Sequence, residues 1–219
     1  MPALAVIGTG AVGQAIAGRA AEVGYQVVVG ARTADSASLA PFAGRERIST
    51  GMFADAARSA PLVVNATNGN VSLDALRAAG ADHLRGKVIL DLANELHPNE
   101  SGAVISGASA ENSLGLRIQQ AFPEADVVKA LNTMNNAVMI HPELIPGDHL
   151  VFLAGDSAAA KDRVRELLRA FGWREPQLLD LGGIDAAAAT EMMMAAWLRV
   201  GSARGWDAPP FNWAIHSAG

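Results

Sequence analysis

The chain has 219 residues, of which 50% are apolar and 18% charged, with no cysteine and a formal net charge of −5. This length and composition can bury the core of one domain and exclude wholesale disorder. The acidic balance, without a block of like charges, argues against a nucleic-acid partner, and the absence of cysteine excludes disulfides, thiol nucleophiles and Cys-ligated metals.

Short apolar runs rich in β-branched residues alternate with Ala-rich stretches, which is typical of βαβ units. We expect strands over residues 4–8, 26–30, 62–66, 87–92, 127–131, 150–154 and 178–181, and Ile48 can end another short strand. We expect helices over residues 12–23, 52–60, 73–79, 114–122, 158–171 and 186–203, with Asp156 and Ser157 as N-caps of the fifth. The stretch 94–113, rich in Gly, Ser and Asn, is typical of a long loop bordering a ligand. The predicted fold class is α/β, a Rossmann-type, doubly wound, mostly parallel sheet with a small helical C-terminal extension.

A glycine-rich turn follows the first expected strand. The segment "VIGTGAVG" places Gly8, Gly10 and Gly13 at G-x-G-x-x-G spacing, and it also opens the first expected helix. In such a turn the first glycine permits the tight bend, the second lets the backbone approach a pyrophosphate and the third allows the helix to pack closely. The free N–H groups of the helix N-terminus then bind phosphate. The motif predicts a dinucleotide site.

The second expected strand ends in "VVVGART" without the Asp or Glu that commonly binds a ribose 2′-hydroxyl. Arg32 stands there instead. An arginine can pair with a 2′-phosphate through charge-assisted, often bidentate hydrogen bonds, whereas a carboxylate would repel that phosphate. The pattern therefore favours NADP over NAD, with Thr9 and Thr33 as further hydroxyl donors, and the alternative is a solvated surface arginine.

The glycine loop, "VVVGAR", "VVKALNT" at residues 127–133, "FLAGDS" at 152–157 and the late apolar helix together resemble the coenzyme F420-dependent NADP oxidoreductase family. Reductase domains of STEAP metalloreductases are related to it. The resemblance implies that NADP(H) exchanges a hydride between the nicotinamide C4 and a stacked deazaflavin or flavin. It also implies that Thr9, Ala31 and Arg32 surround the 2′-phosphate. The chain differs from some members in having Ser36 in place of a lysine, and from many F420 enzymes in having Asn132-Thr133 in place of His-Thr.

Three strand ends, "NATNGN" (65–70), "LANEL" (92–96) and "ALNTMNN" (130–136), are expected to converge on the nicotinamide. Their amides and hydroxyls suit ribose and carboxamide groups, although Asn, Thr and Gly are also ordinary turn residues. The full set of expected cofactor contacts is Gly8, Thr9, Gly10, Ala11, Val12, Gly13, Ala31, Arg32, Thr33, Ala66, Thr67, Asn68, Ala93, Asn94, Asn132 and Thr133.

The late helix "EMMMAAWLRV" is apolar on nearly every face, so we expect it to be buried in a core or against a partner. The tail "PPFNWAI" puts two aromatic residues near the C-terminus, which suggests docking on the acceptor side, on a second subunit or as a terminal plug. The expected acceptor contacts are Met134, Met193, Trp197, Phe211 and Trp213. We expect a homodimer sealed by this helix.

The five histidines show no metal-ligand spacing, so we expect no catalytic metal. His97 and His141 follow expected site strands and are weak candidates for a proton donor; the alternative is two ordinary loop histidines.

Several enzyme classes do not fit the sequence. A short-chain dehydrogenase needs Tyr-x-x-x-Lys, but Val29 lies four residues after Tyr25, the only tyrosine. β-Hydroxyacid dehydrogenases and imine reductases carry a large helical second domain, for which too little chain follows. No signal-type start and no apolar run of about 18 residues is present, so we expect no membrane association and a cytoplasmic protein.

The predicted function is an NADP(H)-dependent oxidoreductase that transfers hydride to or from a small-molecule acceptor of deazaflavin or flavin type, such as F420. Residues 1–155 would form the NADP-binding Rossmann domain and residues 156–219 a helical part that completes the acceptor site and forms the dimer interface. Two alternatives remain: an NADPH-dependent reductase of a small carbonyl, imine or quinone, and a non-catalytic NADP(H)-binding module that senses redox state.

Overall fold

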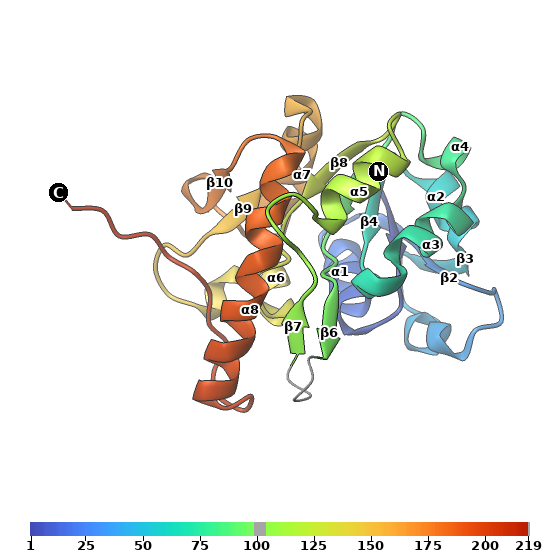
Figure 1. Cartoon of the computed structure of the whole chain (residues 1–219). Helices are drawn as coiled ribbons and strands as arrows, with labels where there is room; N and C mark the ends of the chain where they lie inside the picture. Colours follow the sequence, from blue (N-terminus) through green and yellow to red (C-terminus); the bar gives the residue numbers. More distant parts are fainter. Residues whose placement is uncertain (99–103, 219) are drawn as a thin grey trace.

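The computed structural model describes residues 1–98 and 104–218. Its centre is a six-stranded sheet with the order β3-β2-β1-β4-β5-β8, in which every pairing is parallel (Figure 1). This is the strand order of a Rossmann fold, and it confirms the predicted fold class. The six strands are β1 (Ala3–Ile7), β2 (Gln26–Ala31), β3 (Ile48–Met52), β4 (Leu62–Asn65), β5 (Val88–Asp91) and β8 (Asp126–Lys129).

Helices cover both faces of the sheet, because alternate side chains of each strand enter two separate cores. In β1, Leu4 and Val6 face one core while Ala5 and Ile7 face the other. The first face is covered by α1 (Ala11–Glu22), α6 (Asn136–Ile140) and α7 (Ala158–Phe171). The second is covered by α2 (Phe53–Ser59), α3 (Gly69–Ala79), α4 (Ala81–Leu84) and α5 (Leu114–Ala121).

The C-terminal part adds a small second sheet and a long helix. Strands β9 (Val151–Leu153) and β10 (Leu178–Asp180) pair in parallel, and an antiparallel bridge between Lys129 and Ala154 joins them to the edge of the main sheet. The last helix, α8 (Ala187–Arg204), lies against α5 and the short strand β7 (Val104–Ser106). The 3-10 helices are η1 (Ala37–Phe42), η2 (Pro142–Leu144), η3 (Glu175–Gln177) and η4 (Ile184–Ala186).

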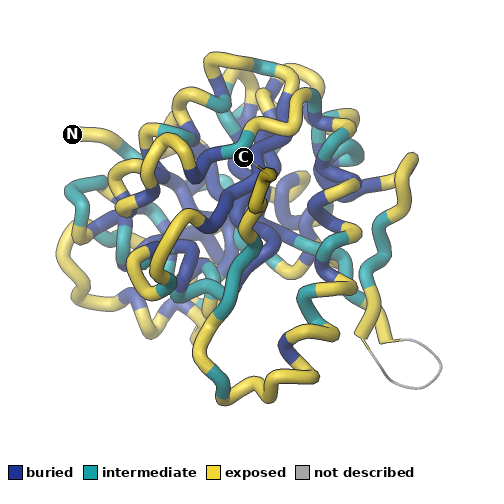
Figure 2. Tube along the Cα trace, turned by 90° about the vertical axis from the view of Figure 1, so that its left-hand side faces the viewer, coloured by how far each residue is buried: buried dark blue, intermediate teal, exposed yellow. Residues whose placement is uncertain are grey.

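Two expectations are wrong, and a third is reduced to one of its two alternatives. Residues 94–113 are not all loop, because β6 (Leu96–Pro98) and β7 (Val104–Ser106) form an antiparallel hairpin; residues 99–103 lie outside the described part. Ile48 begins β3 rather than ending a strand, because this strand is defined by pairing with β2 and not by an apolar run. The second half of α8 is not buried in a core of this chain, as its exposed colouring in Figure 2 shows. Burial against a partner remains the open alternative for that surface.

Candidate functional site

The glycine loop joins β1 to α1, whose N-cap is Gly10. Gly8 has a φ of +121°, and a Cβ there would lie 2.5 Å from the Ala66 carbonyl oxygen. A Cβ on Gly13 would lie 2.1 Å from the carbonyl oxygen of Gly8, whereas one on Gly10 would have no neighbour within 4 Å. Two glycines are therefore required by backbone packing, while Gly10 borders open space at a helix N-terminus, where N–H groups are free to bind an anion.

A cleft of about 370 Å³ opens in front of this loop. It brings together the loop, the end of β2 and the turn after β4, which are three of the regions that the sequence predicted. Ser38 and Phe53 also line it and were missed, because neither belongs to a nucleotide-binding motif. The lining residues are Gly8, Thr9, Gly10, Ala31, Arg32, Ser36, Ser38, Phe53, Ala66, Thr67 and Asn68.

Two serines shape the end of the cleft near Arg32. The Oγ atoms of Ser36 and Ser38 are 2.8 Å apart, and the Ser36 hydroxyl accepts a hydrogen bond from the backbone N–H of Ser38 at the start of η1. Arg32 is exposed and makes no ion pair with any described residue. Thr33 is exposed and lies outside the cleft lining. This end of the cleft therefore offers one free guanidinium and two hydroxyls.

The loops after β5 and β8 lock together beyond the cleft. Asn94 Nδ2 donates to the backbone oxygen of Asn132 at 2.8 Å, and Asn132 Nδ2 donates to Asn94 Oδ1 at 3.0 Å. The backbone N–H of Gly69, after β4, donates to the backbone oxygen of Asn94 at 3.2 Å. Asn132 Oδ1 is buried and has no hydrogen-bond partner in the described part of the chain. The three predicted strand ends thus do meet, and they leave one buried acceptor open.

A buried charge cluster lies directly beneath these loops. The Lys129 ammonium is fully buried and lies 2.9 Å from Asp91 Oδ2 and 2.9 Å from Glu191 Oε1 of α8. It also donates to the Ala93 backbone oxygen. Burial alone would lower the pKa of Lys129, but the charges and hydrogen bonds of Asp91 and Glu191 outweigh it, so the pKa lies above its ordinary value and the side chain is charged.

Both carboxylates of the cluster also accept hydrogen bonds from groups other than Lys129. The oxygens of Glu191 accept hydrogen bonds from the backbone N–H groups of Leu114 at 2.8 Å and Gly115 at 2.9 Å, at the N-terminus of α5. Asp91 accepts from Asn65 Nδ2 at 2.8 Å, and Asn65 in turn accepts from the Thr67 hydroxyl at 2.7 Å. No motif in the sequence indicates this pair, because Glu191 lies 62 residues after Lys129.

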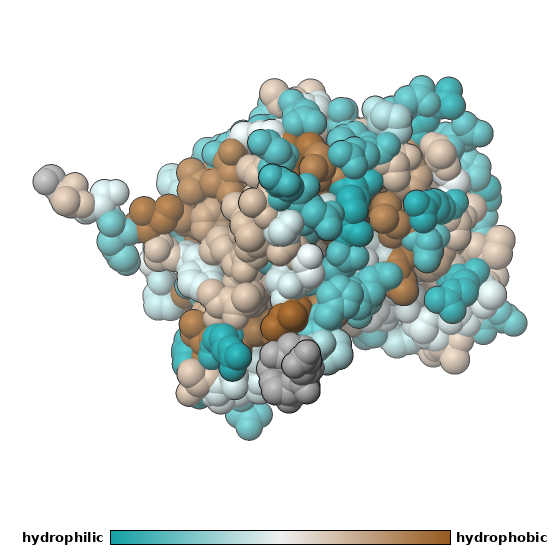
Figure 3. Space-filling model, in the orientation of Figure 1, coloured by the Kyte–Doolittle hydropathy of each residue, from teal (hydrophilic) through white to brown (hydrophobic). Residues whose placement is uncertain are grey.

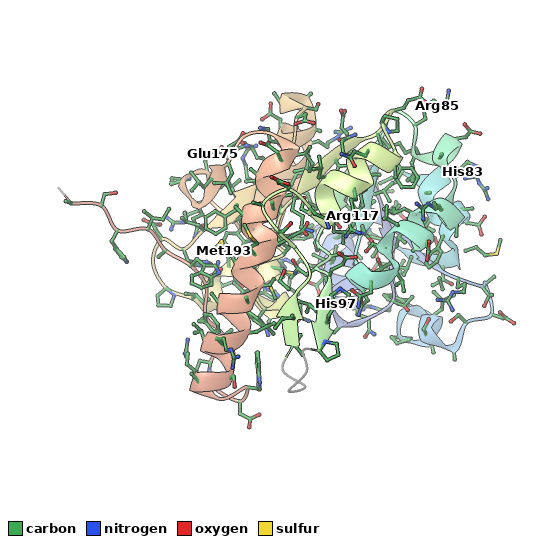
Figure 4. All side chains as sticks on the ribbon, in the orientation of Figure 1. His83, Arg85, His97, Arg117, Glu175 and Met193 are labelled. Carbon is green, nitrogen blue, oxygen red and sulfur yellow. The ribbon has the colours of Figure 1, made fainter. Side chains whose placement is uncertain are left out.

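Aromatic side chains border the far side of the loop 131–136. Trp197 of α8 stacks on Phe211 with ring centroids 5.6 Å apart, and Phe211 meets Trp213 edge-on at 6.4 Å. The Trp213 indole N–H donates to the Thr133 backbone oxygen at 3.2 Å. Met134, in the loop 131–136, is buried, and Met193 is half-buried on α8 (Figure 4). The tail thus docks on its own chain, beside one of the predicted cofactor loops.

The two candidate histidines lie outside the cleft lining. His97 is exposed on β6 (Figure 4), and His141 follows α6, with its Nδ1 2.9 Å from Glu143 Oε1. Among the described residues, no three His, Cys, Asp or Glu side chains gather in a way that could hold a metal ion. No helix of the described chain is long and apolar enough to cross a membrane.

The fold and the glycine-loop cleft define a protein of the Rossmann dinucleotide-binding class. The family described as NADP oxidoreductase, coenzyme F420-dependent, matches residues 3–95. A candidate F420-dependent NADP reductase from Arthrobacter sp. FB24 is 40% identical, with a TM-score of 0.90 over 98% of this chain and 99% of that chain. The protein belongs to this family of NADP oxidoreductases.

Two more distant proteins are similar to most of this chain. Metalloreductase STEAP3 of Rattus norvegicus is 29% identical over 192 residues, which cover 87% of this chain but only 36% of that protein. This chain thus spans about a third of the length of that relative. A reductive aminase from Aspergillus terreus, solved with NADPH and ethyl levulinate, shares the fold with a TM-score of 0.68 and 18% identity, over 93% of this chain and 63% of the other.

Proposed function

We propose that the protein binds NADP(H) in the glycine-loop cleft and transfers hydride between the nicotinamide and a deazaflavin or flavin-type acceptor such as F420. The observation that carries the proposal is that one cleft contains both the open space beside Gly10 and the guanidinium of Arg32, which makes no ion pair with a described residue. A pyrophosphate fits the first, and a 2′-phosphate fits the second together with the Ser36 and Ser38 hydroxyls. Bound NADPH would supply the hydride, while the protein supplies binding and orientation.

The nicotinamide half of the cofactor would lie against the locked loops after β5 and β8. Asn132 Oδ1 is a buried acceptor with no partner among described residues, which fits the donor N–H of a carboxamide. Thr133 and Asn94 lie at the same loops. The cofactor contacts that we expect at Ala93, Asn94, Asn132 and Thr133 are part of this proposal.

The acceptor would enter from the side of α8 and the tail, so that residues 156–219 complete the site begun by residues 1–155. Trp197, Phe211 and Trp213 offer flat apolar rings beside Thr133. Hydride transfer between two stacked rings depends mainly on proximity and orientation, so it needs no general acid. His97 is exposed on β6 and His141 contacts Glu143, so no described contact directs either side chain at the aromatic rings. This favours hydride transfer between rings over reduction of a small carbonyl, imine or quinone, which would need a proton donor.

A homodimer is part of the same proposal. The outer side of α8 and its surroundings expose large apolar side chains, and Figure 3 shows mostly pale and brown surface along the middle of this helix, with hydrophilic colour at its ends. An exposed apolar face of this kind is typical of a surface that a second subunit covers. The exposed residues are Val104, Ile105, Met192, Val200, Trp206 and Ile215.

The reaction is tested by following NADPH absorbance with the protein and a panel of F420, FMN, FAD, ferric chelate and small carbonyls. Turnover with F420 or a flavin is the expected result. Turnover with carbonyls alone would replace the proposal by the small-substrate reductase. NADPH binding without any turnover would favour the redox-sensing module.

Arg32→Ala tests the 2′-phosphate site. We expect the affinity for NADPH to fall by roughly ten- to hundredfold, because a charge-assisted hydrogen bond contributes about 1.5–3 kcal/mol, while NADH affinity changes little. Titration calorimetry with both cofactors measures this. A wild-type protein without preference for NADPH over NADH would contradict the assignment of Arg32.

A further inference from the structure

We infer that Lys129 is a positioning residue that ties α8 to the loops bearing Asn94 and Asn132 and so fixes the nicotinamide half of the site. The inference rests on the proposed function, since it assumes that these loops face the nicotinamide. Lys129, Asp91 and Glu191 are not among the residues that line the cleft.

The position of the ammonium carries the first step. Its nitrogen contacts three elements at once: the Asp91 carboxylate at the end of β5, the Ala93 carbonyl in the following loop and the Glu191 carboxylate on α8. Ala93 immediately precedes Asn94, and Lys129 lies three residues before Asn132. One buried charge therefore sets the spacing of the two loops that lock together.

Backbone strain at the same place carries the second step. Leu131, between Lys129 and Asn132, is fully buried and has a φ of +62°, a conformation that costs a bulky residue about 1–3 kcal/mol. Such a conformation persists only when the surroundings fix it. The fixed points on either side are Lys129 and the hydrogen bonds between Asn132 and Asn94.

The chemistry of the cluster carries the third step. A buried ion pair is seldom more stabilising than well-packed apolar residues of the same volume, so stability alone does not account for three ionised groups here. A requirement to hold the two loops and α8 in fixed positions does account for them. Glu191 completes the tie by accepting two hydrogen bonds from the N-terminus of α5, which orients α8 against the sheet edge.

The test separates the two halves of the cofactor. The Glu191→Gln variant retains the shape and part of the hydrogen bonding, and Lys129→Met removes the ammonium. For each variant, calorimetry measures the affinity for 2′,5′-ADP, which carries only the phosphate end, and for NADPH, which carries both ends. We expect 2′,5′-ADP affinity within about twofold of wild type, NADPH affinity weakened about tenfold and kcat lowered about a hundredfold, since a misplacement of about 1 Å can cost that much.

Lys161→Met is the matched control, because Lys161 forms another 2.9 Å pair, with Asp180 on β10, away from the cleft. It should leave both affinities and kcat unchanged. Hydrogen exchange in the cofactor-free protein gives an independent readout, and Glu191→Gln should speed exchange in residues 93–95 and 131–134. If Lys129→Met does not fold, Glu191→Gln decides alone.

Two outcomes overturn the inference: equal losses of 2′,5′-ADP and NADPH affinity, which indicate a purely structural role, or no loss of either. Failure of the proposed function looks different, because the wild-type protein itself would then bind neither ligand, or would bind NADPH without turnover of F420 or a flavin.

Discussion

The phosphate end and the nicotinamide end of the proposed site are held by different kinds of contact. The phosphate end consists of turns within single strand–turn–helix units: the glycine loop between β1 and α1, and Arg32 and Ser36 between β2 and η1, with Ser38 in the first turn of η1. The nicotinamide end depends on contacts between distant segments, such as Asn94 with Asn132, Leu114 with Glu191 and Thr133 with Trp213. The first end keeps its shape wherever the sheet forms, whereas the second requires α8 and the tail to be docked.

This contrast predicts that substitutions at the two ends fail in different ways. Changes in the glycine loop should affect either the fold or phosphate binding, depending on which glycine is replaced. Changes near α8 should leave phosphate binding intact and affect the reaction.

The largest effect is expected for Gly13→Ala. Alanine is normally favoured over glycine within a helix by about 0.5–1 kcal/mol, but here the new methyl group would lie 2.1 Å from a backbone oxygen that cannot move freely. We expect the free energy of unfolding to fall by about 3 kcal/mol and Tm by roughly 6–12 °C. Thermal unfolding followed by circular dichroism measures this, and an unchanged or higher Tm would contradict the close packing at Gly13.

Gly10→Ala is its matched partner. The φ of Gly10 is −72°, which alanine adopts freely, and the methyl group would enter open space. Tm should therefore change by no more than about 3 °C, as expected for less than 1 kcal/mol, while NADPH affinity falls at least about tenfold because the methyl group blocks the approach of the pyrophosphate. Unchanged affinity would show that the phosphates do not lie against this turn.

A smaller effect is expected for Phe211→Ala. The substitution removes the ring that links Trp197 to Trp213, and so loosens the tail on the acceptor side. We expect KM for the acceptor to rise by roughly tenfold, corresponding to about 1.4 kcal/mol, with NADPH affinity unchanged. Steady-state kinetics with the best acceptor of the panel measures this. Trp213→Phe keeps a ring but removes the hydrogen bond to Thr133, and it should have a weaker effect in the same direction.

The same contrast explains what the sequence could and could not predict. The sheet, most helices and the residues around Gly8 and Arg32 were predictable, because strand patterns and motif spacings are local properties of a chain. The β6–β7 pair was missed because two strands of three paired residues each give too short a pattern to distinguish from loop. The pairing of Lys129 with Glu191 was missed because single charged residues 62 positions apart carry no signal before the fold brings them together.

The smallest effect is expected for Ser36→Lys, which adds a second cation to the phosphate end. Ser36 is half-buried and lines the cleft with Arg32, so an ammonium there would face the 2′-phosphate from the cleft wall. An exposed charge pair contributes about 0.2–1 kcal/mol, so NADPH should bind roughly two- to fivefold more tightly at low salt, and the gain should shrink at high salt. NADH affinity should not improve. Ser36→Gln loses the same hydroxyl without adding charge, so an equal gain in that variant would show that the serine, and not the missing cation, limits NADPH binding.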